Sequence, residues 1–202
     1  MNDIDRFFLE LDKETDTPLK IILTGAMAGM ILGNVRPSVD IDFEIEISTK
    51  EKKEESVNSA IQSVSERLGI PAEYSDNIEG WGQISFLNYR ETAKLYKQIG
   101  KIKVFVLSPE CWSIGKISRY LELDQKDVAT IFKKKSIRFE KICDFWALAL
   151  RSSRLSGKSA EFRDHVINFF KEEGQNIWGK DFDPIAAIKR FKNKAGISET
   201  KQ

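Results

Sequence analysis

Hydrophobic and polar residues alternate strictly from Val39 to Ile47, and this alternation is the clearest structural pattern in the chain. A period of two residues is typical of a β-strand with one buried face and one polar face. The apolar positions are Val39, Ile41, Phe43, Ile45 and Ile47, and the acidic positions between them are Asp40, Asp42, Glu44 and Glu46. The pattern predicts a strand whose polar face is lined with carboxylates.

The rest of the first half of the chain alternates between helical and strand patterns. Apolar residues three or four positions apart predict helices, and short apolar runs that end at glycine predict strands. The expected helices are residues 2–12, 26–32 and 50–68, and the further expected strands are residues 20–24, 80–87 (after a turn) and 101–107. This order predicts an α/β fold.

After residue 108 the pattern is helical throughout. Ser108 and Pro109 suit the N-cap and the first position of a helix. The expected helices are residues 109–121, 124–134, 138–152, 159–172 and 183–193. We therefore expect an α/β core over residues 1–108 and a helical region over residues 109–202 that packs on this core.

Composition narrows the class of protein. Of the 202 residues, 41% are hydrophobic and 31% are charged, which is enough apolar material for a core. Two cysteines cannot form a disulfide framework, and a single histidine, His165, excludes a multi-histidine zinc site. The apolar stretches are too short to span a membrane and the acidic start has no signal-peptide pattern, so we expect a cytoplasmic protein without a membrane partner.

The net charge of +1 conceals an uneven distribution of charged residues. Residues 1–55 carry 7 basic and 13 acidic side chains, whereas residues 133–163 carry 9 basic and 3 acidic side chains. Such segregation suits a protein that gathers metal ions at one place and phosphates at another. The alternative is ordinary variation in charge among helical surfaces.

Asp40 and Asp42 are the strongest candidates for metal ligands. Alternate residues of a strand share a face and lie about 6.6–7 Å apart, so both carboxylates can reach one cation. Mg²⁺ typically takes one or two carboxylates and completes its shell with phosphate oxygens and water. The alternative is a solvated outer face, because Glu44 and Glu46 continue the acidic pattern.

The residues before these aspartates suit a triphosphate. Thr24, Gly25 and Ala26 form a strand-to-helix turn, and the start of a helix offers free N–H groups and positive dipole charge to phosphates. Gly25 allows a close backbone approach. Arg36 and Ser38 can add a guanidinium fork and a hydroxyl.

The segment Leu23-Thr24-Gly25-Ala26, followed by Arg36-Pro37-Ser38-Val39-Asp40-Ile41-Asp42-Phe43, resembles the nucleotidyltransferase superfamily that includes DNA polymerase β. It is most similar to the AbiEii-type branch, the toxin component of some bacterial toxin–antitoxin systems. Lys116-Ile-Ser-Arg119 and Asp124-Gln-Lys-Asp127 resemble the downstream lysine and aspartate elements of that branch.

This resemblance implies a nucleotidyltransferase fold, with a mixed sheet flanked by helices. It also implies a Mg²⁺-dependent (or Mn²⁺-dependent) enzyme that transfers a nucleoside monophosphate from an NTP to a hydroxyl. The acceptor would be RNA such as tRNA, or a protein, and an antitoxin would be a further partner. It implies Asp40 and Asp42 as metal ligands, and it places Gly25, Ala26, Arg36 and Ser38 around the triphosphate. Lys116 would contact a phosphate, and Asp127 would act as a base or orienting group.

The sequence departs from the family pattern at two points. Ala26 stands where the family usually has glycine or serine, and the expected later strands carry no central acid; Asp127 or Glu44 are the substitutes. A catalytically weak or inactive nucleotide-binding protein of the same fold, and a non-enzymatic interaction partner, therefore remain alternatives. For single residues, the alternatives are a surface lysine at Lys116 and a helix cap at Asp124.

A basic run opens the cationic part of the chain. It contains Lys133, Lys134, Lys135 and Arg138. With a polynucleotide acceptor, such a run would follow the phosphate backbone without reading bases. The alternative is a solvated helical face.

Overall fold

The computed structural model describes residues 2–33, 38–47 and 51–197. Contacts group the chain into two compact units. The sheet unit comprises Met1–Ile78 and Tyr89–Ser108, and the helical unit comprises Glu79–Asn88 and Pro109–Gln202. The chain passes from one unit to the other after Ile78, Asn88 and Ser108, so Glu79–Asn88 group with the helices although they precede residue 108.

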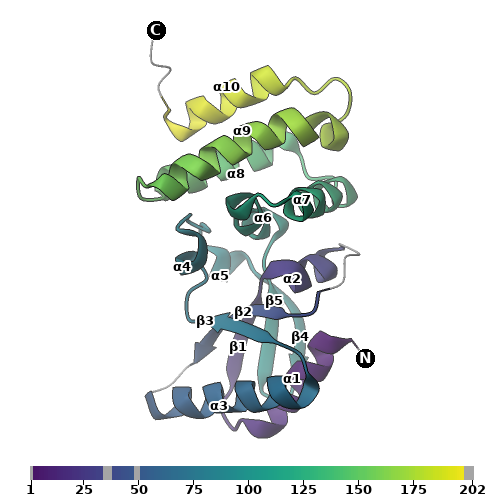
Figure 1. Cartoon of the computed structure of the whole chain (residues 1–202), viewed down its shortest axis with the longest axis vertical. Coiled ribbons are helices and arrows are strands. Elements are labelled where there is room, and N and C mark those ends of the chain that lie inside the picture. Colours follow the sequence, from purple (N-terminus) through teal and green to yellow (C-terminus); the bar gives the residue numbers. More distant parts are fainter. Residues whose placement is uncertain (1, 34–37, 48–50, 198–202) are drawn as a thin grey trace. The chain divides into compact units, whose positions relative to one another are not determined.

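Over its described residues, the sheet unit contains a five-stranded mixed sheet in the order β3-β2-β1-β5-β4 (Figure 1). The strands are β1 (Leu19–Leu23), β2 (Ile41–Ile47), β3 (Ala72–Ser75), β4 (Lys94–Ile99) and β5 (Ile102–Val106). β1 pairs antiparallel with β2 and parallel with β5, while β2 and β3 are parallel and β4 and β5 antiparallel. The prediction of a mixed sheet combined with helices is confirmed.

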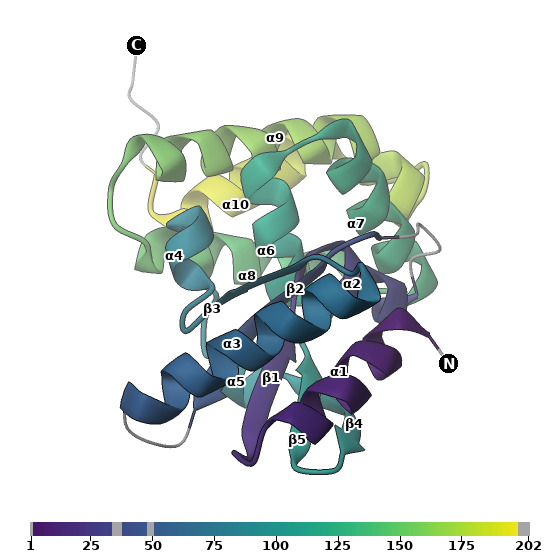
Figure 2. The same cartoon turned by 60° about the horizontal axis from the view of Figure 1, so that its bottom comes forward.

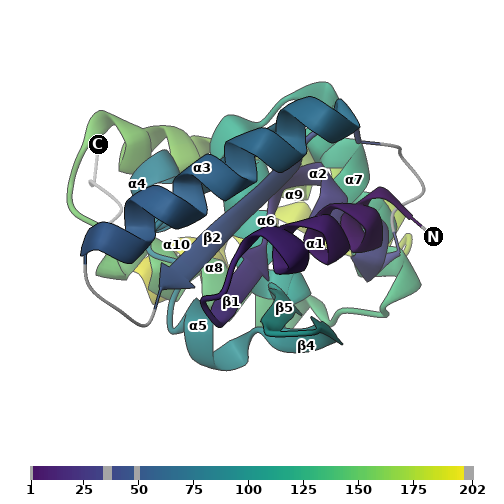
Figure 3. The same ribbon diagram turned by 90° about the horizontal axis from the view of Figure 1, so that it is seen from below.

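One face of this sheet is covered by α1 (Asp3–Glu14) and α3 (Glu51–Leu68), which run side by side across the strands in Figures 2 and 3. Phe43 of β2 is fully buried here, and its ring lies 5.7 Å from the ring of Phe8 of α1. The apolar half of the alternating pattern therefore forms the core, and the acidic half is turned to the opposite face.

Three details of the sheet unit differ from the sequence prediction. The strand begins at Ile41 instead of Val39, whose side chain is 82% exposed, so Asp40 lies at a bend before the strand. β3 and β4 were not expected. Residues 80–87 form no strand: residues 80–82 belong to the single turn of α4 (Glu79–Gly82), and residues 83–87 have irregular backbone.

The helical unit is built around α6–α10. Their bounds are α6 (Pro109–Arg119), α7 (Glu122–Lys134), α8 (Phe139–Ser152), α9 (Gly157–Trp178) and α10 (Pro184–Ala195). Trp146 of α8 and Phe170 of α9 are fully buried and stack with ring centroids 5.8 Å apart. Such an aromatic core stabilises the unit through buried apolar area and favourable ring geometry. α8, α9 and α10 pack against one another, as Figure 1 shows.

None of the helices in the described part of the chain is long and apolar enough to cross a membrane.

Candidate functional site

The turn from β1 into α2 (Gly25–Leu32) brings a glycine against a carboxylate. Thr24 is extended, and its N–H donates to the main-chain oxygen of Asp42 at 2.9 Å. Gly25 follows with φ of +61°, in the left-handed region that favours glycine. A Cβ atom at Gly25 would lie 1.7 Å from Oδ2 of Asp42. The absence of a side chain at Gly25 therefore allows the Asp42 carboxylate to lie against the first residue of α2.

The start of α2 is a favourable place for negative charge. The N–H groups in the first turn of a helix lack intrahelical acceptors, and the helix dipole adds partial positive charge there. Gly25 and Ala26 supply backbone and little side-chain bulk at this end. The structure thus brings together, within the sheet unit, two parts of the motif that are distant in the sequence: Thr24–Ala26 and Asp42.

Asp40 lies one step before β2 and is oriented by a serine. The hydroxyl of Ser38 donates to Oδ1 of Asp40 at 2.6 Å, and both residues are half-buried. A hydroxyl that is bonded to a carboxylate helps to fix that carboxylate in one orientation. Arg36, the expected guanidinium fork, lies outside the described residues.

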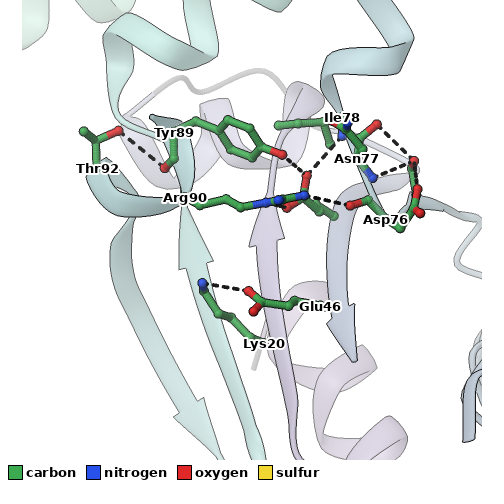
Figure 4. A network of polar contacts seen from close by, with 10 residues as sticks. Lys20, Glu46, Asp76, Asn77, Ile78, Tyr89, Arg90 and Thr92 are labelled. Atoms are coloured by element: carbon green, nitrogen blue, oxygen red, sulfur yellow. Dashed lines mark hydrogen bonds and ion pairs between the residues drawn. The ribbon is translucent and has the colours of Figure 1, made fainter. Parts of the chain in front are cut away.

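Glu44 is fully engaged in a different contact network, which Figure 4 shows. Its carboxylate is 1% exposed, accepts the Ile78 N–H at 3.1 Å and the hydroxyl of Tyr89, and pairs with Nε of Arg90 at 2.6 Å. The hydrogen bond that Arg90 donates to the Glu44 carboxylate raises the pKa of Arg90. These partners occupy both carboxylate oxygens, so the geometry argues against Glu44 as the third metal ligand.

The sheet supplies an acid that the sequence analysis did not consider. Glu73 of β3 is the register neighbour of Asp42, and side chains in register on parallel strands point to the same face. Glu73 is exposed. The only sequence signal for its strand is the short run from Ala72 to Ser75 after Pro71, which is too brief for a periodic pattern.

The donor set at this end of β2 fits a hard cation that is only partly held by protein. Asp40 and Asp42 are oxygen donors, and Mg²⁺ often takes no more than two carboxylates alongside substrate phosphates and water. In the described parts of the chain, no group of three or more acidic, histidine or cysteine side chains is close enough to hold a metal ion. Any Mg²⁺ here would therefore depend on phosphate and water oxygens.

Lys116 and Asp127 belong to the helical unit, where they form a buried ionic cluster. Nζ of Lys116 lies 2.8 Å from Oδ1 of Asp124 and 2.9 Å from Oδ2 of Asp127. All three side chains are under 5% exposed. Arg119 adds two hydrogen bonds to Asp124 from the solvent side.

This cluster shows that two alternatives from the sequence are wrong: a surface lysine at Lys116 and a helix cap at Asp124. Lys116 is not a surface lysine, since its side chain is 2% exposed and lies over the ring of Trp112. Asp124 is not an N-cap, because α7 begins at Glu122 with Leu121 as its cap, and Asp124 lies within the first turn. The contacts favour a role in joining α6 to α7.

The basic run lies where α7 ends and α8 begins. Lys133 donates to the amide oxygen of Asn176 at 2.9 Å, Lys135 is the C-cap of α7, and Arg138 is the N-cap of α8 and pairs with Glu140 at 3.5 Å. Lys134 is also exposed. Cations are favourable at the C-terminal end of a helix, so part of this charge has a structural explanation.

Comparisons with protein-family models, with curated proteins and with solved structures find no match to the chain.

Proposed function

We propose that the protein is a nucleotidyltransferase that moves a nucleoside monophosphate from an NTP to an acceptor hydroxyl. The observation that carries this proposal is the contact between the Asp42 carboxylate and Gly25 at the start of α2. It joins an oxygen ligand for a cation to a helix end suited to phosphates, and both belong to the motif that resembles the nucleotidyltransferase superfamily.

In this proposal, the residues of the turn bind and orient the triphosphate. Backbone N–H groups at the start of α2 would face the phosphates, and the missing side chain at Gly25 leaves room for the Asp42 carboxylate beside them. Asp40, oriented by Ser38, and Asp42 would hold Mg²⁺ (or Mn²⁺). The bound metal would stabilise charge on the transferring phosphoryl group and on the leaving pyrophosphate.

The reaction itself is an in-line displacement. The acceptor oxygen forms a bond to the α-phosphorus, the bond from that phosphorus to the bridging oxygen of the β-phosphate breaks, and pyrophosphate leaves. The proton of the acceptor hydroxyl passes to a general base. Asp127 is a poor candidate for the base in the described conformation, because it is buried and bonded to Lys116. Glu73 is the better candidate for this base, because it is exposed and is the register neighbour of Asp42.

The acceptor is proposed to be RNA such as tRNA, or a protein. The exposed cations from Lys133 to Arg138 support a polyanionic acceptor by charge alone. A toxin role, with a cognate antitoxin as partner, rests on the motif resemblance and on no contact described above.

A second candidate is a protein of the same class that binds nucleotide without turning it over. Two observations favour it: Glu44 is committed to Ile78, Tyr89 and Arg90, and Lys116 is buried between two aspartates. This candidate predicts thermal stabilisation by NTP with Mg²⁺, but no release of pyrophosphate.

The test incubates the protein with each α-labelled NTP, Mg²⁺ and total RNA or cell lysate, and follows the label by gel electrophoresis. Asp42→Asn should abolish labelling, and Glu46→Gln is the matched control because Glu46 lies on the same strand and face but pairs with Lys20 at the surface. Stabilisation without labelling selects the second candidate. If the protein shows no stabilisation and no labelling, the result favours a non-enzymatic interaction partner.

A further inference from the structure

The last helix of the helical unit, α10, carries positive charge that its own sequence does not balance. Its 12 residues contain no acidic side chain and four basic ones: Lys189, Arg190, Lys192 and Lys194. Lys189 and Lys194 are exposed, and Arg190 and Lys192 are half-buried. The helix therefore presents a row of cations to solvent.

The apolar side of α10 is used by the core of the helical unit. Ala187 and Phe191, four positions apart on one side of the helix, are 2% and 0% exposed. The outer side lines an open depression in the surface of the helical unit, formed by Ala186, Lys189, Arg190, Asn193 and Lys194. What α10 offers to a partner is therefore charge rather than apolar area.

Asp144 of α8 is the carboxylate that contacts these cations. It accepts hydrogen bonds from Nε and Nη2 of Arg190 at 3.1 Å and 2.8 Å, and it lies 3.8 Å from Nζ of Lys194. Lys189 and Lys192 form no ion pair with any residue that the structure describes. One carboxylate against four cations leaves most of the positive charge of α10 without a partner.

The structure of the helix explains only part of this charge. Lys192 and Lys194 lie in the last turn, where cations are favourable to the helix dipole. Lys189 and Arg190 precede that turn and gain less from it. Elsewhere in the helical unit, exposed lysines such as Lys126 and Lys158 pair with glutamates of their own helix. The excess on α10 is typical of a surface that binds a polyanion.

The shape of this surface favours a nucleic-acid backbone over a membrane. A helix that binds a membrane surface inserts an exposed apolar side into the lipid, whereas the large apolar side chain that α10 leaves exposed is Ile185 alone, at 80%. Lys189 and Lys194 lie about 7.5 Å apart along the helix axis. Because one strand of a duplex carries a phosphate about every 3.4 Å of its axis, this length covers more than one phosphate.

We propose that α10 is an RNA-binding helix whose lysines, Lys189, Lys192 and Lys194, contact the phosphate backbone while Arg190 stays paired with Asp144. The choice of RNA among polyanions rests on the proposed function, in which RNA is an acceptor. The aromatic residue of α10, Phe191, is buried and unable to stack on a base. Binding therefore depends on the backbone and not on the base sequence.

The experiment measures the binding of a fluorescein-labelled RNA hairpin to the full chain by fluorescence anisotropy, over a range of KCl concentrations and without NTP or metal. The test variant combines Lys189→Gln, Lys192→Gln and Lys194→Gln. It should weaken binding about tenfold or more and lower the slope of log Kd against log salt by about two, because each phosphate contact contributes about 0.7–0.9 to that slope.

The matched control removes three positive charges from the same unit at side chains that pair with carboxylates. It combines Lys126→Gln, Lys158→Gln and Arg163→Gln, whose partners are Glu122, Glu161 and Asp164. The control should change the affinity by less than about twofold and keep the parent slope. A variant with arginine at the three α10 lysines keeps the charge and should also keep the parent slope.

The proposal is overturned if the α10 glutamine variant binds the hairpin as tightly as the parent protein, or if the control variant loses as much affinity. Binding of the parent protein to phosphatidylglycerol vesicles but not to the hairpin would also overturn it. Because the assay contains no NTP, its result is separate from the test of nucleotide transfer. RNA binding that depends on α10 without any transfer of label supports this inference and contradicts only the proposed activity.

Discussion

Replacement of Lys116 by methionine separates a structural role for this lysine from the catalytic role that the sequence motif implies. Methionine keeps much of the length and apolar bulk of lysine but removes the ammonium group. In the folded protein that group lies 2.8 Å and 2.9 Å from carboxylate oxygens of Asp124 and Asp127. The variant therefore leaves two buried carboxylates without their shared cation.

The expected cost follows from this burial. Removing one partner of a buried ion pair typically destabilises a protein by about 3–5 kcal/mol, because the remaining charge is neither hydrated nor paired. Asp124 keeps its bonds to Arg119, whose side chain is 55% exposed. Most of the destabilisation should therefore come from the buried Asp127 carboxylate. Arg119→Met, which removes only the exposed partner, should cost about 1 kcal/mol or less.

Urea unfolding followed by circular dichroism measures both variants against the parent protein. Lys116→Met should lower the free energy of unfolding by about 3–5 kcal/mol, and adding Asp127→Asn should recover part of this loss because one buried charge is removed. A Lys116→Met protein that keeps its stability within about 1 kcal/mol but no longer transfers nucleotide would refute this reasoning, and it would place Lys116 at a phosphate.

Three further substitutions or conditions test other parts of the account. Gly25→Ala should destabilise the sheet unit by about 1–3 kcal/mol through its positive φ and displace the Asp42 carboxylate, so nucleotide-dependent thermal stabilisation should vanish; normal stabilisation would contradict the close contact. Phe170→Ala should lower the free energy of unfolding by about 3–5 kcal/mol in urea, and a loss under 1 kcal/mol would show that its ring is not in the core. Burial raises the pKa of Cys143 to about 12, above its unfolded value, so the stabilising contribution of this protonated thiol is complete below about pH 8.5 and is lost as the pH rises toward 12. Cys143→Ala should therefore flatten the decline in stability between pH 9 and 11 in urea titrations, and an unchanged decline would assign it to other groups.

The parts of the fold that could be predicted were those with a periodic pattern. The alternation around β2 identified its buried face, and the helical spacing after Ser108 found every helix of α6–α10 to within a few residues at most ends. β3 and β4 gave no such pattern, because one is only four residues long and the other, at the edge of the sheet, is mostly exposed. The prediction of a strand over residues 80–87 was wrong, because Ile84 and Phe86 alternate with polar residues and yet belong to irregular backbone.

The residues of the candidate site could be predicted from the local motif. The contacts between residues that are far apart in the sequence could not. Gly25 and Asp42 could be named from the motif, although the contact between them depends on strand pairing that the sequence does not reveal. Glu44 has the same residue type and the same strand face as Asp42, but only its partners Tyr89 and Arg90, more than forty positions later, give it a structural role. Burial of Lys116 likewise depends on two aspartates of the next helix.

The proposed nucleotide transfer at the Asp42 end of β2 is tested by the transfer of label from α-labelled NTP to RNA or protein in cell lysate with Mg²⁺. We expect labelling by the parent protein and by Glu46→Gln, and a loss of about a hundredfold or more in Asp42→Asn. Equal labelling by Asp42→Asn and the parent protein, or no labelling by the folded parent protein with any NTP in Mg²⁺ or Mn²⁺, would contradict it.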